Sequence, residues 1–213
     1  MKKSYIGLCC ALLASASAVQ AADLSLALAL GTDYWNPTPS GTVNDAGAHY
    51  DDQSQWTFWA DLRHGIPLLP NVNLQRTTYD TNGLGVNNDL EAWDLALYYR
   101  LFDNDLFGIG GGLDLRQYNG SWFGKDYDEL EPLAYLQAEA NIPGTSLSVF
   151  GDARGAAWDG NHSHDYRVGM ALEFVPKFHL RGGYRNVRLD DNVDGVKLTQ
   201  NMDGWFAGAE YRF

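Results

Sequence analysis

The last ten residues constrain the fold of this chain more than any other stretch. Gly204 to Phe213 alternates strictly, with apolar and aromatic side chains at every second position. Trp205 and Phe213 share one face of such a strand and stand eight residues apart. A tilted transmembrane strand rises roughly 2.5 Å per residue along the barrel axis, so the two rings would lie about 20 Å apart, near the height of an apolar membrane band. The pattern favours a transmembrane β-strand over its alternative, the edge strand of a soluble sandwich.

The beginning of the chain has the pattern of a secretory signal peptide. Lys2 and Lys3 precede a short apolar core, Ile6 to Leu13, and small residues lead up to Ala21. Signal peptidase cleaves after such small residues, so we predict a cut after Ala21. Both cysteines fall inside this segment, so we expect no disulfide in the mature chain. The predicted organisation is a signal peptide over 1–21 and one domain over 22–213.

Ten segments of alternating polarity follow the predicted signal peptide, separated by five longer polar loops and four short turns. The segments cover residues 23–35, 53–63, 72–79, 90–102, 106–118, 132–142, 145–158, 166–175, 178–189 and 204–213. Long external loops, short periplasmic turns and an even strand number are typical of outer-membrane barrels. The sequence therefore predicts an all-β protein, a single antiparallel up-and-down transmembrane β-barrel of about ten strands.

The third segment is the weakest of the ten. Arg76 shares the parity of the outward-facing Val72 and Leu74. A charge on the lipid face costs about 2–4 kcal/mol at the bilayer midplane and little near the rim. We therefore expect a bulge here, or a strand that bends out of the membrane early.

The charged residues of the segments share one parity, strand after strand. A soluble barrel would bury such charges in a dry core at high cost, whereas a membrane barrel has a polar interior. All the inward cations are arginines, which pair with carboxylates through two parallel hydrogen bonds. We predict a lumen charge network and a closed or very narrow lumen. Its predicted members are Asp61, Arg63, Asp94, Arg100, Asp114, Arg116, Glu139, Asp152, Arg154, Arg167, Glu173, Arg181, Arg185, Glu210 and Arg212, with Asp33 at the same parity in the first segment.

The predicted external loops carry most of the excess acidic residues of a chain whose formal net charge is -12. The densest acidic cluster consists of Asp126, Asp128, Glu129 and Glu131, whose spacing matches no EF-hand pattern. Three interpretations stay open: plain solvation of exposed loops, divalent cations that bridge loop carboxylates to anionic lipid headgroups, or attraction of a cationic partner. We expect no cofactor and no nucleic-acid partner, since no basic patch is present.

Two short motifs were weighed as chemistry. His162-Ser163-His164-Asp165 contains a base, a nucleophile and a carboxylate, but adjacent residues of an extended segment point apart. The same two histidines lack a third metal ligand. Gly110 to Gly112 lies inside a segment with no helix or lysine after it, so it predicts close approach of a bulky neighbour rather than a phosphate loop. We assign no catalytic or metal residue.

Parts of the chain resemble two known sets of outer-membrane proteins. The aromatic residues Trp205, Tyr211 and Phe213 are similar to the C-terminal signature by which bacterial outer-membrane proteins are recognised by the barrel-insertion machinery. Gly108 to Gly112 and the turn Gly65 to Asn71 resemble a family of small proteobacterial outer-membrane barrels named for a Gly-Gly motif. These resemblances imply a barrel in the cell outer membrane, in contact with outer-membrane lipid, and no established substrate.

The function that the sequence predicts is a non-enzymatic outer-membrane barrel of structural or narrow-channel type. Two alternatives stay open: a barrel enzyme that hydrolyses lipid or peptide at the outer rim, and an adhesion or receptor barrel that works through its acidic loops.

Overall fold

The computed structural model describes residues 26–43, 46–51, 53–66, 68–83, 86–122, 125–156, 163–193 and 196–213. The predicted signal peptide lies outside the described residues. The strands are β1 (Leu26–Val43), β2 (Ala46–Asp51), β3 (Gln55–His64), β4 (Asn71–Gly83), β5 (Val86–Asp103), β6 (Phe107–Trp122), β7 (Lys125–Asn141), β8 (Leu147–Gly155), β9 (His164–Val175), β10 (Phe178–Val193) and β11 (Val196–Arg212).

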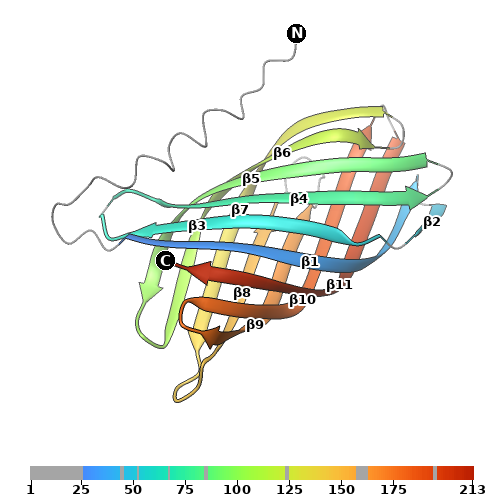
Figure 1. Cartoon of the computed structure of the whole chain (residues 1–213). Coiled ribbons are helices and arrows are strands. Elements are labelled where there is room, and N and C mark those ends of the chain that lie inside the picture. Colours follow the sequence, from blue (N-terminus) through green and yellow to red (C-terminus); the bar gives the residue numbers. More distant parts are fainter. Residues whose placement is uncertain are drawn as a thin grey trace, which may run out of the picture.

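The strands form one antiparallel sheet that closes on itself. β11 pairs with β1 from Ala29↔Arg212 to Val43↔Leu198, and Figure 1 shows the last strand (red) beside the first (blue). β2 and β3 share the place between β1 and β4, because both pair with these two strands. Ten strand positions therefore surround the lumen, which confirms the prediction of a ten-stranded up-and-down barrel. Among the described residues, no helix is long and apolar enough to cross a membrane.

The strands are longer than the sequence predicted, and most of the predicted external loops are strand instead. Residues 119–122 extend β6 and residues 125–131 begin β7, so the acidic cluster from Asp126 to Glu131 lies on a strand. The prediction of long acidic loops was wrong there because the extended hairpins carry polar residues on both faces. Hydrophobic alternation ends in such a segment, while the backbone ladder continues.

The outside of the barrel carries the apolar belt of a transmembrane barrel. Leucine, valine and methionine side chains of successive strands are exposed between two rims of exposed aromatic rings. One rim contains Tyr34, Trp56, Trp93, Tyr166 and Trp205, and the other contains Tyr99, Phe107, Phe174, Tyr211 and Phe213. Trp205 and Phe213 are 72% and 61% exposed, so these residues of the C-terminal signature face outward at opposite rims. This belt suits lipid contact.

Arg76 does face outward, but the expected bulge is absent. β4 pairs with β5 in one register from Asn71↔Tyr98 to Gly83↔Val86, and the register shifts between β5 and β6 instead, at Arg100/Phe102. Arg76 lies opposite Trp93 at the aromatic rim, where it pairs with Glu91 and sits over the Trp93 ring. A paired charge at the rim needs no bulge, because its cost there falls to about 0–1 kcal/mol.

The glycine run allows close strand contact, as predicted. A Cβ on Gly112 would lie 2.0 Å from the Leu97 carbonyl oxygen, and one on Gly110 would lie 3.0 Å from the Tyr98 ring. Side chains here would push β5 and β6 apart.

Side chains fill the interior in three layers. The turn end is the end at which β1 begins and β11 ends, and the opposite end is the loop end. Toward the loop end lies an apolar core built from Trp35, Tyr79, Leu90, Ala92, Tyr118, Val187, Leu189, Met202 and Phe206. A buried charge cluster lies below it, and a polar cavity opens at the turn end.

Candidate functional site

The centre of the lumen is organised around Asp165, at the start of β9. Its carboxylate accepts hydrogen bonds from Arg116 Nη2 at 2.9 Å and from Arg185 Nε and Nη2 at 2.9 and 2.6 Å. All three side chains are about 1% exposed. Arg116 also pairs with Asp94 on β5, so two acids and two arginines form one closed cluster. Such pairs are costly to bury unless every charge is matched, and this geometry matches them.

Neutral side chains complete the coordination of Arg185. Its Nη1 donates to Thr57 Oγ1 at 2.8 Å, and its Nη2 donates to Tyr79 Oη at 3.2 Å. The guanidinium lies over the Trp35 ring, 4.8 Å from the centroid. Arg185 on β10 thus joins residues of β1, β3 and β4 across the lumen.

A second group of charges closes the other side of the lumen. Arg167 donates to both oxygens of Asp152 at 3.0–3.2 Å and to Asp33 at 3.1 Å. Arg154 binds Asp152 at 2.8 Å and lies 3.3 Å from Asp114. These side chains are at most about a tenth exposed. Together with the Asp165 cluster, they span the barrel.

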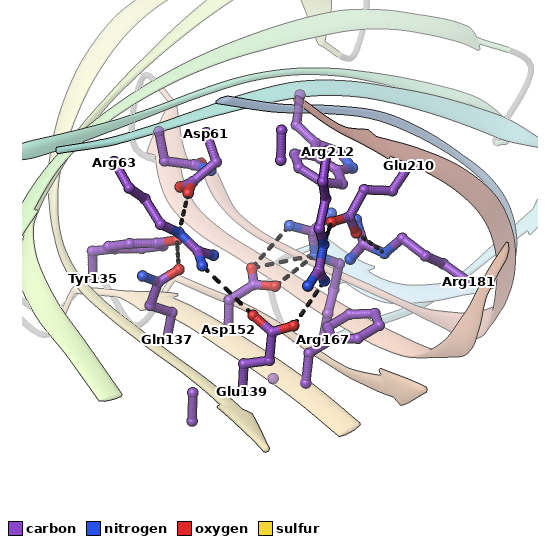
Figure 2. Close-up of a pocket in the computed structure, with 16 residues that line it drawn as sticks. Asp61, Arg63, Tyr135, Gln137, Glu139, Asp152, Arg167, Arg181, Glu210 and Arg212 are labelled. Atoms are coloured by element: carbon purple, nitrogen blue, oxygen red, sulfur yellow. Dashed lines mark hydrogen bonds and ion pairs between the residues drawn. The ribbon is translucent and has the colours of Figure 1, made fainter. Parts of the chain in front are cut away.

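The turn end holds a cavity of about 70 Å³ (Figure 2). Its rim is a chain of ion pairs that starts from Asp61, passes through Arg63 and Glu139, and ends at Arg212. Arg212 also pairs with Glu210. The rim side chains of Arg63, Glu139 and Arg212 are 21–35% exposed, so the cavity opens at this end. Its inner wall includes the buried charges of the second group.

Thirteen of the fifteen predicted network residues line the lumen in these clusters, and the other two, Arg100 and Glu173, lie outside the clusters at strand ends. Arg100 pairs with Asp103 at the adjoining turn, where both are exposed. Glu173 is exposed and accepts a hydrogen bond from the Lys177 backbone N–H at 3.0 Å. Arg100 also lines a small pocket beside Arg63 and Glu139, so its side chain lies at the turn-end rim of the lumen.

Asp165 belongs to the network although it was not predicted as a member. We expected it in a loop, whereas β9 begins at His164. The available signal was parity, because Asp165 lies two residues before the inward-facing Arg167. The neutral partners Thr57, Tyr79 and Tyr98, whose hydroxyl donates to Asp61, carried no charge signal and were also missed.

The histidine-serine motif is not assembled into a catalytic group. Ser163 is buried and Asp165 points into the lumen, bound to two arginines. His164 stacks on Tyr166 and its Nε2 lies 2.9 Å from Asn186 Oδ1, on the outer face. His162 lies outside the described residues. In the described part of the chain, no group of three or more His, Cys, Asp or Glu side chains could hold a metal ion.

Solved outer-membrane structures are similar to this one. The outer membrane protease OmpT from Escherichia coli superposes with a TM-score of 0.62 at 8% identity, over 91% of this chain and 99% of that chain. Neisserial surface protein A gives a TM-score of 0.45 at 15% identity, over 90% of this chain and all of that chain. No family model and no curated protein matches the chain in sequence. The closed ten-stranded barrel with its apolar belt is a transmembrane barrel of the outer-membrane type.

Proposed function

We propose that this protein is a non-enzymatic structural barrel of the outer membrane, with a lumen closed by its own side chains. One observation carries the proposal. Asp94, Arg116, Asp165 and Arg185 bridge the lumen and are each at most about 1% exposed. A barrel of about eight strands is just filled by its own side chains, and the slightly wider interior of ten strands is occupied here by large arginine, tyrosine and tryptophan side chains. Because solvent does not reach these bridging side chains, they leave no open path for water through the lumen.

The apolar core toward the loop end supports the same function. Trp35 and Met202 are completely buried, and Tyr118 and Phe206 are at most 4% exposed. An ion would have to cross this apolar layer before it reached the charge cluster. Two successive seals of different chemistry favour a structural barrel over a narrow channel.

A protease function is less well supported, although the outer membrane protease has this fold. Hydrolysis needs a base or a nucleophile that can reach substrate and water. Asp94 and Asp165 are committed to arginines, and Ser163 and His164 lie on opposite faces of the strand. These contacts support a non-enzymatic role.

The partners stay as predicted from the sequence: outer-membrane lipid at the apolar belt, and the barrel-insertion machinery at Trp205, Tyr211 and Phe213. Divalent cations at the acidic residues of β7 and membership of the Gly-Gly family also stay predictions.

Conductance of the refolded protein tests the closed lumen. Folded barrel, identified by its heat-modifiable gel mobility, is added to a planar bilayer. We expect no stable channel steps. A double variant, Trp35→Ala with Arg185→Ala, removes one large side chain from each seal and should produce discrete steps. Arg188→Ala on the outer face of the same strand is the matched control and should stay silent. Stable steps of tens of picosiemens from the unaltered protein would overturn the proposal.

A further inference from the structure

The turn-end cavity contains one arginine whose hydrogen bonding is unfinished. Arg181 on β10 is 8% exposed, and its Nε makes no hydrogen bond with any described residue. Its closest carboxylate oxygens are Glu210 Oε2 at 3.6 Å and Asp33 Oδ2 at 3.9 Å. The three other arginines that line the cavity each donate to a carboxylate at hydrogen-bonding distance. Among the four arginines that line the cavity, Arg181 is therefore the one without a hydrogen-bonded carboxylate in the described part of the chain, and Figure 2 shows it at one side of the cavity.

The carboxylates closest to Arg181 already bind other arginines. Glu210 accepts from Arg212 Nε through its other oxygen. Asp33 Oδ2 accepts from Arg167 Nη1 at 3.1 Å. These pairs hold both acids 3.6–3.9 Å from Arg181, beyond hydrogen-bonding distance. A buried donor without a hydrogen-bond partner is costly, so an acceptor that reaches Arg181 Nε from the cavity would be favoured.

Two aromatic rings hold the guanidinium of Arg181 in place. Its central carbon lies 4.4 Å from the Trp59 ring centroid and 4.1 Å from the Phe150 ring centroid. Gly31 makes room for the Trp59 ring, since a Cβ there would lie 2.2 Å from it. Because the rings cover the guanidinium, its N–H edge is the direction left for a ligand. The Trp59 indole Nε1 is a second buried donor without an acceptor among the described residues, and it lines the same cavity.

We infer that this cavity is a binding site for a small carboxylate anion, with Arg181 as the anchoring residue. A carboxylate is planar and presents two oxygens to the edge of a guanidinium, which matches a fork fixed between two rings. The volume of about 70 Å³ exceeds the roughly 10–15 Å³ that one water needs, so the cavity has room for a small anion such as formate or acetate. The lining contains four acids and four arginines, and each arginine except Arg181 donates a hydrogen bond to one of these acids.

The ligand would enter from the turn end, the predicted periplasmic side. The rim residues there are partly exposed, whereas the charge clusters close the inner side. The site is thus a blind pocket, which does not depend on whether the lumen conducts.

Titration of the folded protein with sodium acetate tests the site. The refolded full barrel in detergent micelles is titrated calorimetrically with acetate, formate and benzoate at constant ionic strength, with sodium chloride as the reference anion. We expect saturable 1:1 binding of acetate and formate and no saturation by chloride or benzoate. Absence of saturation at about 100 mM acetate, far above a millimolar Kd, would show that water alone fills the cavity and would overturn the inference.

A set of variants identifies the anchor. Arg181→Gln should weaken acetate binding at least about tenfold, because it removes the charge-assisted bonds. Arg181→Lys keeps the charge and the fold but lacks the planar fork, so weaker binding is expected there too, which covers a failure of the glutamine variant to fold. Arg188→Gln, on the outer face of the same strand, should bind as the unaltered protein does. Undiminished binding by folded Arg181→Gln or Arg181→Lys, or equally tight binding of chloride, would contradict the assignment.

Discussion

Replacing Asp165 with asparagine should destabilise the barrel more than any exposed charge change. The carboxylate accepts three charge-assisted hydrogen bonds from Arg116 and Arg185 in a fully buried setting. Each such bond contributes about 1.5–3 kcal/mol, so complete loss would cost about 4–9 kcal/mol. Part is recovered, because Arg116 keeps Asp94, Arg185 keeps Thr57, and the amide oxygen still accepts one bond. We expect a loss of about 4 kcal/mol, within the 3–5 kcal/mol typical of a broken buried pair.

Equilibrium unfolding in guanidinium chloride, followed by heat-modifiable mobility and tryptophan fluorescence, measures this loss. With a slope of about 2–6 kcal/mol per molar, the midpoint of Asp165→Asn should fall by about 1 M. Asp126→Asn, an exposed position on β7, is the matched control and should shift by less than about 0.5 kcal/mol. If Asp165→Asn lies within about 1 kcal/mol of the unaltered protein at an unchanged slope, the charge cluster does not hold the lumen together.

Two further predictions concern the wall of the barrel. Gly112→Val should lower the free energy of unfolding by about 3 kcal/mol or more and reduce the heat-modifiable folded fraction, since its Cβ would lie 2.0 Å from the backbone of β5. Gly47→Ala is the control, because a Cβ there has no described neighbour within 4 Å. Equal folded fractions of the two variants would refute the close approach of β5 and β6. Arg76→Leu should change the free energy of unfolding by less than about 1 kcal/mol, because its partner Glu91 is about a third exposed at the rim. A loss above about 2 kcal/mol would show instead that the Arg76–Glu91 pair holds β4 to β5.

The strand number, the pairing order and the inward parity of the charges were predictable. Alternate residues of each strand face lipid and lumen, so apolar and polar side chains alternate with a period of two. Strand length was not predictable in the same way. In residues 126–131 acidic side chains lie on both faces of β7. Hydrophobic alternation therefore does not mark the strand there, although β6 continues to Trp122 and β7 begins at Lys125. The bulge predicted at Arg76 was wrong for a related reason. The parity of a residue indicates which face of the strand it lies on, but not its height along the barrel axis.

The sequence predicted which charged residues of the candidate site face the lumen. It did not predict which of these residues form ion pairs with one another. Parity identified Arg167 and Arg185, but their partners depend on the tilt and closure of the barrel, which bring strands β1, β3 and β4 across to β9 and β10. The unfinished bonding of Arg181 is a matter of a few tenths of an ångström and of two rings. No single-sequence pattern contains that information.

The bonds that seal the lumen join residues far apart along the chain, and this shapes how the barrel can assemble. Arg167 contacts Asp33 across 134 residues, and Arg185 contacts Thr57 across 128. A sheet that has not yet closed can form the pairs between neighbouring strands, such as Arg167–Asp152, but it lacks these long-range bonds, which form only when the barrel closes. The bonds across the lumen therefore stabilise only the closed barrel. Before closure the sheet keeps open edges, which remain accessible to the machinery that inserts the chain into the membrane.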